Sequence, residues 1–90
     1  MIDPASIPQL NKHFRLQWEE AQNCYVLLYP EGMVKLNESA GLILNCVDGS
    51  KSVEVIIAEL TERFPQVEDI ASDIEAFMTT ASAQRWVAFS

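Results

Sequence analysis

The feature that most constrains the fold is a change in the spacing of apolar residues near position 37. Between residues 14 and 36 apolar side chains alternate with polar ones or form short runs, and from residue 37 to residue 83 they recur every three or four positions. The first pattern is typical of strands and the second of amphipathic helices. The sequence therefore predicts an α+β fold in which a three-stranded antiparallel sheet is followed by three helices, the element order of winged-helix-like domains. The 90 residues, 49% of them hydrophobic, have the size of one domain with one core.

The strand region divides into three segments. Phe14 to Trp18 alternates, as a half-buried strand requires, and Cys24 to Tyr29 is apolar on both faces, as a central strand requires. Pro30-Glu31-Gly32 has the residues of a short hairpin turn. Met33 to Leu36 is then the returning strand.

This third strand has the pattern of a sheet edge. If Val34 and Leu36 face the core, Met33 and Lys35 face outward. Natural edges are often protected by lysine, so Lys35 has a structural explanation as well as a functional one.

Caps and breakers mark the three helices. Asn37 is a good N-cap for a first helix that ends at Gly49, and Ser52 is the cap of a second helix that Pro65 stops. The third helix is the longest and has an unbroken apolar stripe. The residues of that stripe are Val67, Ile70, Ala71, Ile74, Phe77, Met78 and Ala81.

The N-terminal segment lacks a sustained period. We expect residues 1–12, with Pro4 and Pro8, to form an extended arm that leads into a domain of residues 13–90. The arm has no basic and apolar signal-peptide pattern, which favours the cytoplasm. The longest apolar stretches, such as Cys24 to Tyr29, are far shorter than the roughly 20 residues of a membrane span.

Most catalytic site types cannot be assembled from this composition. His13 is the single histidine and there are three glycines, which disfavours histidine metal sites and glycine-rich nucleotide loops. Cys24 and Cys46 are too far apart for a CxxC motif, and both lie in apolar segments, as reduced core thiols do. We expect a chain that is not an enzyme and needs no cofactor or metal.

The charge favours a protein or peptide partner. Thirteen acidic residues against six basic ones give a net charge of -7, which repels nucleic acids and anionic membranes. A winged-helix nucleic-acid binder remains an alternative because of the element order. The third helix, however, has four acidic residues and no base before Arg85.

Two binding modes remain open on the residues alone. The edge strand can accept an extended peptide as an added strand, with Ile70, Ile74 or Phe77 lining a groove beside it; core packing is the competing interpretation of all three. A small-molecule or quinone carrier is the other mode, with aromatic side chains as stacking surfaces and core packing again as the competing interpretation. Those side chains are Trp18, Tyr25, Tyr29 and Trp86.

Several motifs occur together at characteristic spacings. They are Phe14-Arg15-Leu16-Gln17-Trp18, Val26-Leu27-Leu28-Tyr29-Pro30-Glu31-Gly32, Leu36-Asn37-Glu38-Ser39-Ala40, Ile43-Leu44 and Asp48-Gly49. Each is weak alone, but together they resemble the PqqD family, the small accessory proteins of pyrroloquinoline quinone (PQQ) biosynthesis. The resemblance extends from Pro8 to Trp86.

Membership would imply a peptide-recognition domain of the kind shared by many peptide-modifying pathways. Such a domain would bind the ribosomal precursor peptide PqqA and present it to PqqE, a radical S-adenosylmethionine enzyme that joins a glutamate to a tyrosine. The resemblance implies that the peptide adds to the third strand and rests against the third helix. The implied site residues are Met33, Val34, Lys35 and Leu36, with Ile70, Asp73, Ile74 and Phe77 opposite.

The oligomeric state has two interpretations. A monomer is the simpler one. An open strand edge and an extended arm are also the ingredients of a strand-exchanged dimer.

Overall fold

The computed structural model describes residues 2–90. Its elements, in chain order, are β1 (Pro8–Leu10), β2 (Arg15–Glu19), β3 (Cys24–Tyr29), β4 (Gly32–Lys35), α1 (Glu38–Asn45), α2 (Val53–Arg63), α3 (Ile70–Ala83) and β5 (Val87–Phe89). The predicted order of three strands and three helices is confirmed, and two short strands are added at the ends of the chain. Within residues 2–90, no helix combines the length and the apolar character that crossing a membrane requires.

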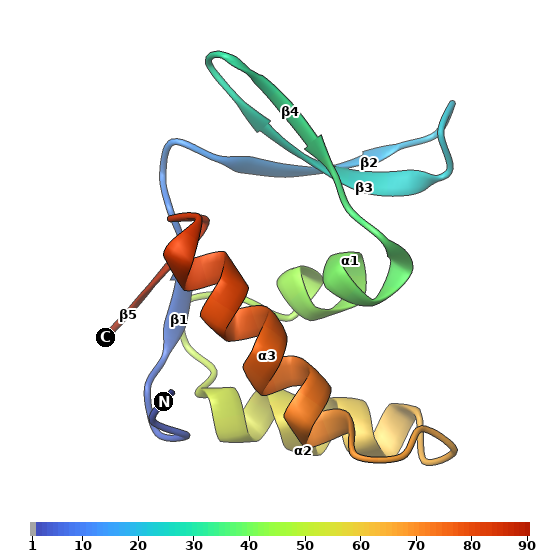
Figure 1. Ribbon diagram of the computed structural model, residues 1–90, viewed down its shortest axis with the longest axis vertical. Coiled ribbons are helices and arrows are strands. Elements are labelled where there is room, and N and C mark those ends of the chain that lie inside the picture. Colours follow the sequence, from blue (N-terminus) through green and yellow to red (C-terminus); the bar gives the residue numbers. More distant parts are fainter. Residues whose placement is uncertain (1) are drawn as a thin grey trace.

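The three-stranded sheet is an antiparallel meander. Its order is β2-β3-β4, so β3 is central and β4 lies at one edge, as predicted (Figure 1). Leu27 pairs with Leu16 on one side and with Val34 on the other. Val26 and Leu27 are fully buried, which explains why the central segment is apolar on both faces.

A second sheet joins the two ends of the chain. β1 pairs with β5 in antiparallel register, with Gln9 opposite Ala88. The sequence predicts an extended arm here, and the structure shows that part of this arm is a paired strand packed on the rest of the fold. A strand of three residues is too short to show a period, and its partner lies at the other end of the chain, so the pairing leaves no local signal.

The N-caps of α1 and α2 are the residues that the sequence predicts, whereas α1 ends earlier than predicted. The Asn37 side chain accepts a hydrogen bond from the Ala40 N–H at 2.8 Å, and Ser52 caps α2 in the same way. α1 ends at Asn45, four residues before the predicted stop at Gly49. The reason is a separate turn in which Asp48 accepts hydrogen bonds from the N–H groups of Ser50 and Lys51.

The third helix begins later than its apolar stripe. α3 starts at Ile70, whereas the stripe begins at Val67. Val67 lies in the turn after α2 and is 41% exposed, and Asp69 has a left-handed backbone with φ of 53°. The apolar spacing therefore begins before the helix does, because the spacing depends on side-chain type and not on backbone conformation.

Two clusters of buried residues form the core. One lies between the sheet, α1, the C-terminal part of α3 and β5, and includes Leu27 and Ala81. The other lies between the three helices and includes Ile56 and Ile74. α3 contributes to both, and Figure 1 shows it crossing the helical layer from α2 toward the sheet. This path places one side of α3 beside the end of β4.

Candidate functional site

The open edge of β4 has unpaired main-chain groups at two residues. The Leu36 N–H donates to the Tyr25 C=O at 3.0 Å, so Tyr25 and Leu36 form a hydrogen-bonded pair. Hydrogen-bonded and non-hydrogen-bonded pairs alternate along an antiparallel ladder, so Lys35, opposite Val26, is a non-hydrogen-bonded position. The N–H and C=O of Lys35, and by the same alternation those of Met33, point away from β3.

The side chains of β4 divide in the predicted way. Met33 and Lys35 are exposed, whereas Leu36 is buried and Val34 is half-buried. Leu36 and Val34 belong to the core cluster beneath the sheet. The predicted residues of this strand thus have two roles, since Met33 and Lys35 are accessible and the other two fix the strand in place.

One face of α3 meets this edge at the end of β4. It is formed by residues spaced alternately three and four apart, which places them along one side of a helix. These residues are Ile70, Asp73, Phe77, Thr80 and Gln84. Three hollows lie along this face, and we refer to them together as the α3 groove.

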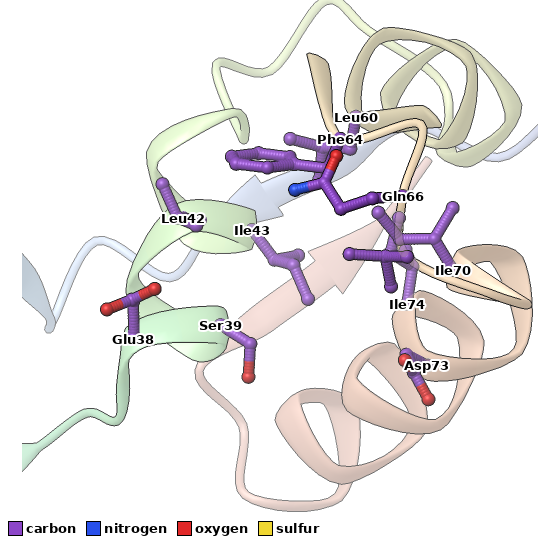
Figure 2. Close-up of a pocket in the computed structure, with 11 residues that line it drawn as sticks. Glu38, Ser39, Leu42, Ile43, Leu60, Phe64, Gln66, Ile70, Asp73 and Ile74 are labelled. Atoms are coloured by element: carbon purple, nitrogen blue, oxygen red, sulfur yellow. The ribbon is translucent and has the colours of Figure 1, made fainter. Parts of the chain in front are cut away.

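The first hollow lies between α1, the end of α2 and the start of α3, and has a volume of about 290 Å³. Figure 2 shows Leu60 and Phe64 on one side, Ile70 on another and Ile43 beneath, with the polar ends of Ser39 and Asp73 at the mouth. Its lining is mainly apolar. Ile74 lies at its base and is fully buried, so this predicted site residue supports the hollow from the core.

The middle hollow connects α3 to β4. Lys35 and Leu36 line one side of it, and Phe77 and Trp86 line the other. The ring centroids of Phe77 and Trp86 lie 6.3 Å apart. The structure thus brings together predicted site residues that are more than forty positions apart in the chain, at the point where β4 ends and α1 begins.

The third hollow lies at the hairpin end of β4. His13 and Glu31 line it, together with Gln84 and Arg85 at the end of α3. The Asn11 side-chain amide donates to the Arg85 C=O at 2.9 Å, which joins the segment before β2 to the end of α3. No sequence pattern predicts these residues as part of the site, because only the folded chain brings positions 11–13 and 84–85 together.

The aromatic residues proposed as a stacking surface are dispersed. Trp18 packs edge-on against Tyr25, with ring centroids 5.1 Å apart. Tyr29 pairs with Phe14, and Trp86 pairs with Phe77. The four side chains therefore lie in three separate aromatic pairs and do not line one cavity.

Three ionisable groups outside the groove have shifted pKa values. Burial raises the pKa of the Cys46 thiol, and hydrogen bonds from Ser50 lower the pKa of Asp48. A hydrogen bond to Glu59 raises the pKa of Lys51. All three groups lie at the turn between α1 and α2. The groove itself offers main-chain hydrogen bonding, apolar contact and surface charge.

Comparisons with known proteins agree on one family. The family model of PqqD, coenzyme PQQ synthesis protein D, matches residues 24–87. A protein of Azotobacter vinelandii named PqqA binding protein is 56% identical over 81 residues, which cover 90% of this chain and 88% of the relative. A protein of Pseudomonas aeruginosa with the same name is 58% identical over 82 residues, which cover 91% of this chain and 89% of the relative.

A solved structure shows the same fold. It is the solution NMR structure of a PqqD truncation of Methylobacterium extorquens PqqCD, described as a functional, stand-alone recognition element for ribosomally synthesized and post-translationally modified peptides. The TM-score is 0.80 at 27% sequence identity, and the match covers 98% of this chain and 95% of that one. The predicted fold class and resemblance are both confirmed, and the chain belongs to the PqqD family.

Proposed function

We propose that this protein binds the precursor peptide PqqA as an added strand on β4 and presents it to the enzyme PqqE in PQQ biosynthesis. The observation that carries the proposal is the open main chain of Met33 and Lys35 beside the α3 groove. The names of the relatives support PqqA as the ligand. The prediction that the chain is not an enzyme is confirmed by its membership of a family of recognition proteins.

Strand addition gives each part of the site a defined task. The N–H and C=O groups of Met33 and Lys35 would form the new ladder, because unpaired edge groups accept an extended chain. Val34 and Leu36 hold β4 in register through their main-chain hydrogen bonds to β3 and through their packing against it. Successive side chains of a strand point to opposite sides, so every second peptide side chain would face α3.

The wall of the site is the α3 face. Phe77 lies beside the end of β4, and Ile70 and Asp73 lie further along the same face of the helix. A peptide side chain that points inward from the added strand would contact Phe77 and Trp86 first. Because these rings are half-buried and apolar, they favour an apolar side chain at that position.

Titration of isotope-labelled protein with PqqA tests the binding step. We expect amide resonances of Met33 to Leu36 and of the α3 face to move, whereas resonances of β2, at the opposite edge of the sheet, stay in place. If no resonance moves at micromolar peptide concentrations, strand addition at β4 is wrong.

The presentation step needs its own assay. PqqE would be supplied with PqqA in the presence and in the absence of this protein, and the amount of cross-linked peptide measured by mass spectrometry. We expect the protein to increase the yield in proportion to the bound fraction of PqqA. An equal yield without it would contradict presentation and leave the peptide titration as a separate result.

A further inference from the structure

The two ends of the α3 groove have opposite charge. At the end near α2, Glu38 and Asp73 line the first hollow, and Glu68 and Asp69 come just before α3. At the hairpin end, His13 and Arg85 line the third hollow and Lys12 is next to His13 in the chain. Glu31 also lines the hairpin end. Arg85 in the lining and the adjacent Lys12 outnumber it, with His13 counted as neutral at pH 7.

These charges are available to a ligand. The ion pair found within residues 2–90 joins Lys51 to Glu59 and involves none of the groove residues. The chain has six lysines and arginines against thirteen acidic residues, so a site where bases outnumber acids stands out in an otherwise negative molecule.

The two ends are far enough apart to act separately. Fourteen residue steps along α3 separate Ile70 from Gln84, and at 1.5 Å per residue this is about 21 Å. Surface charges are screened over about 8 Å at physiological ionic strength. An extended peptide spans the same distance with about six residues. One bound segment would therefore meet both ends, and each end would interact with a different part of it.

We propose that the α3 groove selects its peptide by charge order, with carboxylate residues at the hairpin end and lysine or arginine residues at the end near α2. The inference rests on the proposed function, since it assumes that the peptide lies along β4 and α3. It assigns Arg85 and His13 to one end of the site and Glu38 and Asp73 to the other.

Charge order would solve a problem that main-chain bonding leaves open. An added strand can form a ladder with β4 in the parallel or the antiparallel direction, and in several registers. Reversing the peptide would place like charges together at both ends of the groove, and such contacts reject wrong arrangements. The charges would therefore fix the direction in which PqqA lies on β4.

Charge reversals at the two ends test the proposal. Arg85→Glu and Asp73→Lys should each weaken PqqA binding by about fivefold at low salt, with a smaller loss at high salt. Arg15→Glu and Glu75→Lys are matched controls, because they make the same charge changes at exposed residues that line none of the three hollows of the groove. Thermal melts would establish that all four variants fold.

Changes in the peptide assign each charge to its end. With the Asp and Glu residues of PqqA changed to Asn and Gln, Arg85→Glu should no longer weaken binding and Asp73→Lys should still do so. With the Lys and Arg residues of PqqA changed to Gln, Asp73→Lys should no longer weaken binding and Arg85→Glu should still do so. A nitroxide placed beside the acidic residues of PqqA should broaden the amide signals of His13 and Glu31, and one beside the basic residues should broaden those of Ile70 and Asp73.

The outcomes separate the two proposals. If PqqA shifts the β4 resonances of the wild-type protein but all four charge-reversal variants bind PqqA as tightly as the wild type does, charge order is wrong and strand addition stands. The opposite broadening pattern would also overturn charge order. Failure of wild-type protein to bind PqqA would instead overturn the proposed function itself.

Discussion

Gly41 shows how a single residue sets the distance between α1 and the sheet. A Cβ atom at this position would lie 2.9 Å from Tyr25 Cδ2 and 3.2 Å from Tyr25 Cβ. Real contacts are rarely so short, and the Cβ of Tyr25 is fixed to the main chain of β3. Glycine is thus required by close approach of helix and strand, since its backbone is otherwise ordinary helix.

We expect Gly41→Ala to destabilise the fold by about 1 kcal/mol. Overpacking costs about 1–3 kcal/mol, and the better helix propensity of alanine returns up to about 1 kcal/mol. The free energy of unfolding would be measured in urea. Ser39→Ala, at an exposed position of the same helix, is the control and should change it much less; a more stable Gly41→Ala protein would contradict the close contact.

Lys35 is the residue at which main-chain bonding can be tested directly. Lys35→Pro removes the outward N–H and should weaken PqqA binding by about 1 kcal/mol or more, while the fold persists because edge strands tolerate proline. Lys35→Ala keeps the N–H and should bind almost as well as the wild type. Calorimetric titration and a urea melt would be run on both. Equal losses of stability and binding in Lys35→Pro would contradict the edge assignment.

At the scale of elements, the turn between α1 and α2 depends on one carboxylate. Asp48 accepts hydrogen bonds from the N–H groups of Ser50 and Lys51, and from the Ser50 hydroxyl. Gly49 has φ of +81°, which suits glycine. Lys51 then donates to Glu59 of α2 at 3.0 Å. This turn fixes where α2 starts relative to α1.

We expect the contribution of Asp48 to disappear in acid. Its pKa is lowered from the ordinary value of 3.8, so the stabilisation is fully present above about pH 4 and is lost as pH falls through the pKa of the folded state. Asp48→Ala should therefore be less stable than the wild type at pH 7, and the difference should shrink below pH 4. Urea melts at pH 7 and below pH 4 check this, with Glu62→Ala, at an exposed position of α2, as the control. A stability difference that does not change with pH would contradict it.

At the scale of the whole molecule, the N-terminal segment is part of the fold. Pro8 is fully buried, and β1 is paired with β5. The C=O groups of Pro4 and Ser6 also accept hydrogen bonds from the first N–H groups of α2, at Glu54 and Val53. The N-terminal segment thus links β5, at the C-terminal end of the chain, to the start of α2. Its C=O groups accept hydrogen bonds from N–H groups that the first turn of a helix leaves unpaired.

Deleting residues 1–10 should lower the free energy of unfolding by at least about 3 kcal/mol, because burial of Pro8 and several main-chain hydrogen bonds are lost. Far-ultraviolet circular dichroism and urea melts would measure the effect. The substitution Ala5→Ser, at an exposed position of the same segment, is the control and should cost little. If the protein without residues 1–10 melts like the full chain, the arm is dispensable to the fold. Sedimentation of the full chain would also show whether β1 exchanges between copies.

The sequence predicted the elements that have a local signature. The apolar run of Cys24 to Tyr29 and the caps Asn37 and Ser52 are determined by side-chain chemistry within a few residues, and the structure confirms them. The outward position of Met33 and Lys35 was also readable, because strand side chains alternate. The start of α3 was misplaced at Val67, because apolar spacing does not reveal the left-handed turn at Asp69.

By itself, then, the sequence determined the order of strands and helices, the edge of the sheet and the family. Tertiary structure alone decided the pairing of β1 with β5, and the meeting of His13 with Arg85 at the hairpin end of the groove. It also decided that Ile74 belongs to the core while Asp73, one residue before it, lines the groove. The physical reason is range: local patterns record which backbone a segment prefers, whereas a groove is made by segments that meet only when the whole chain packs.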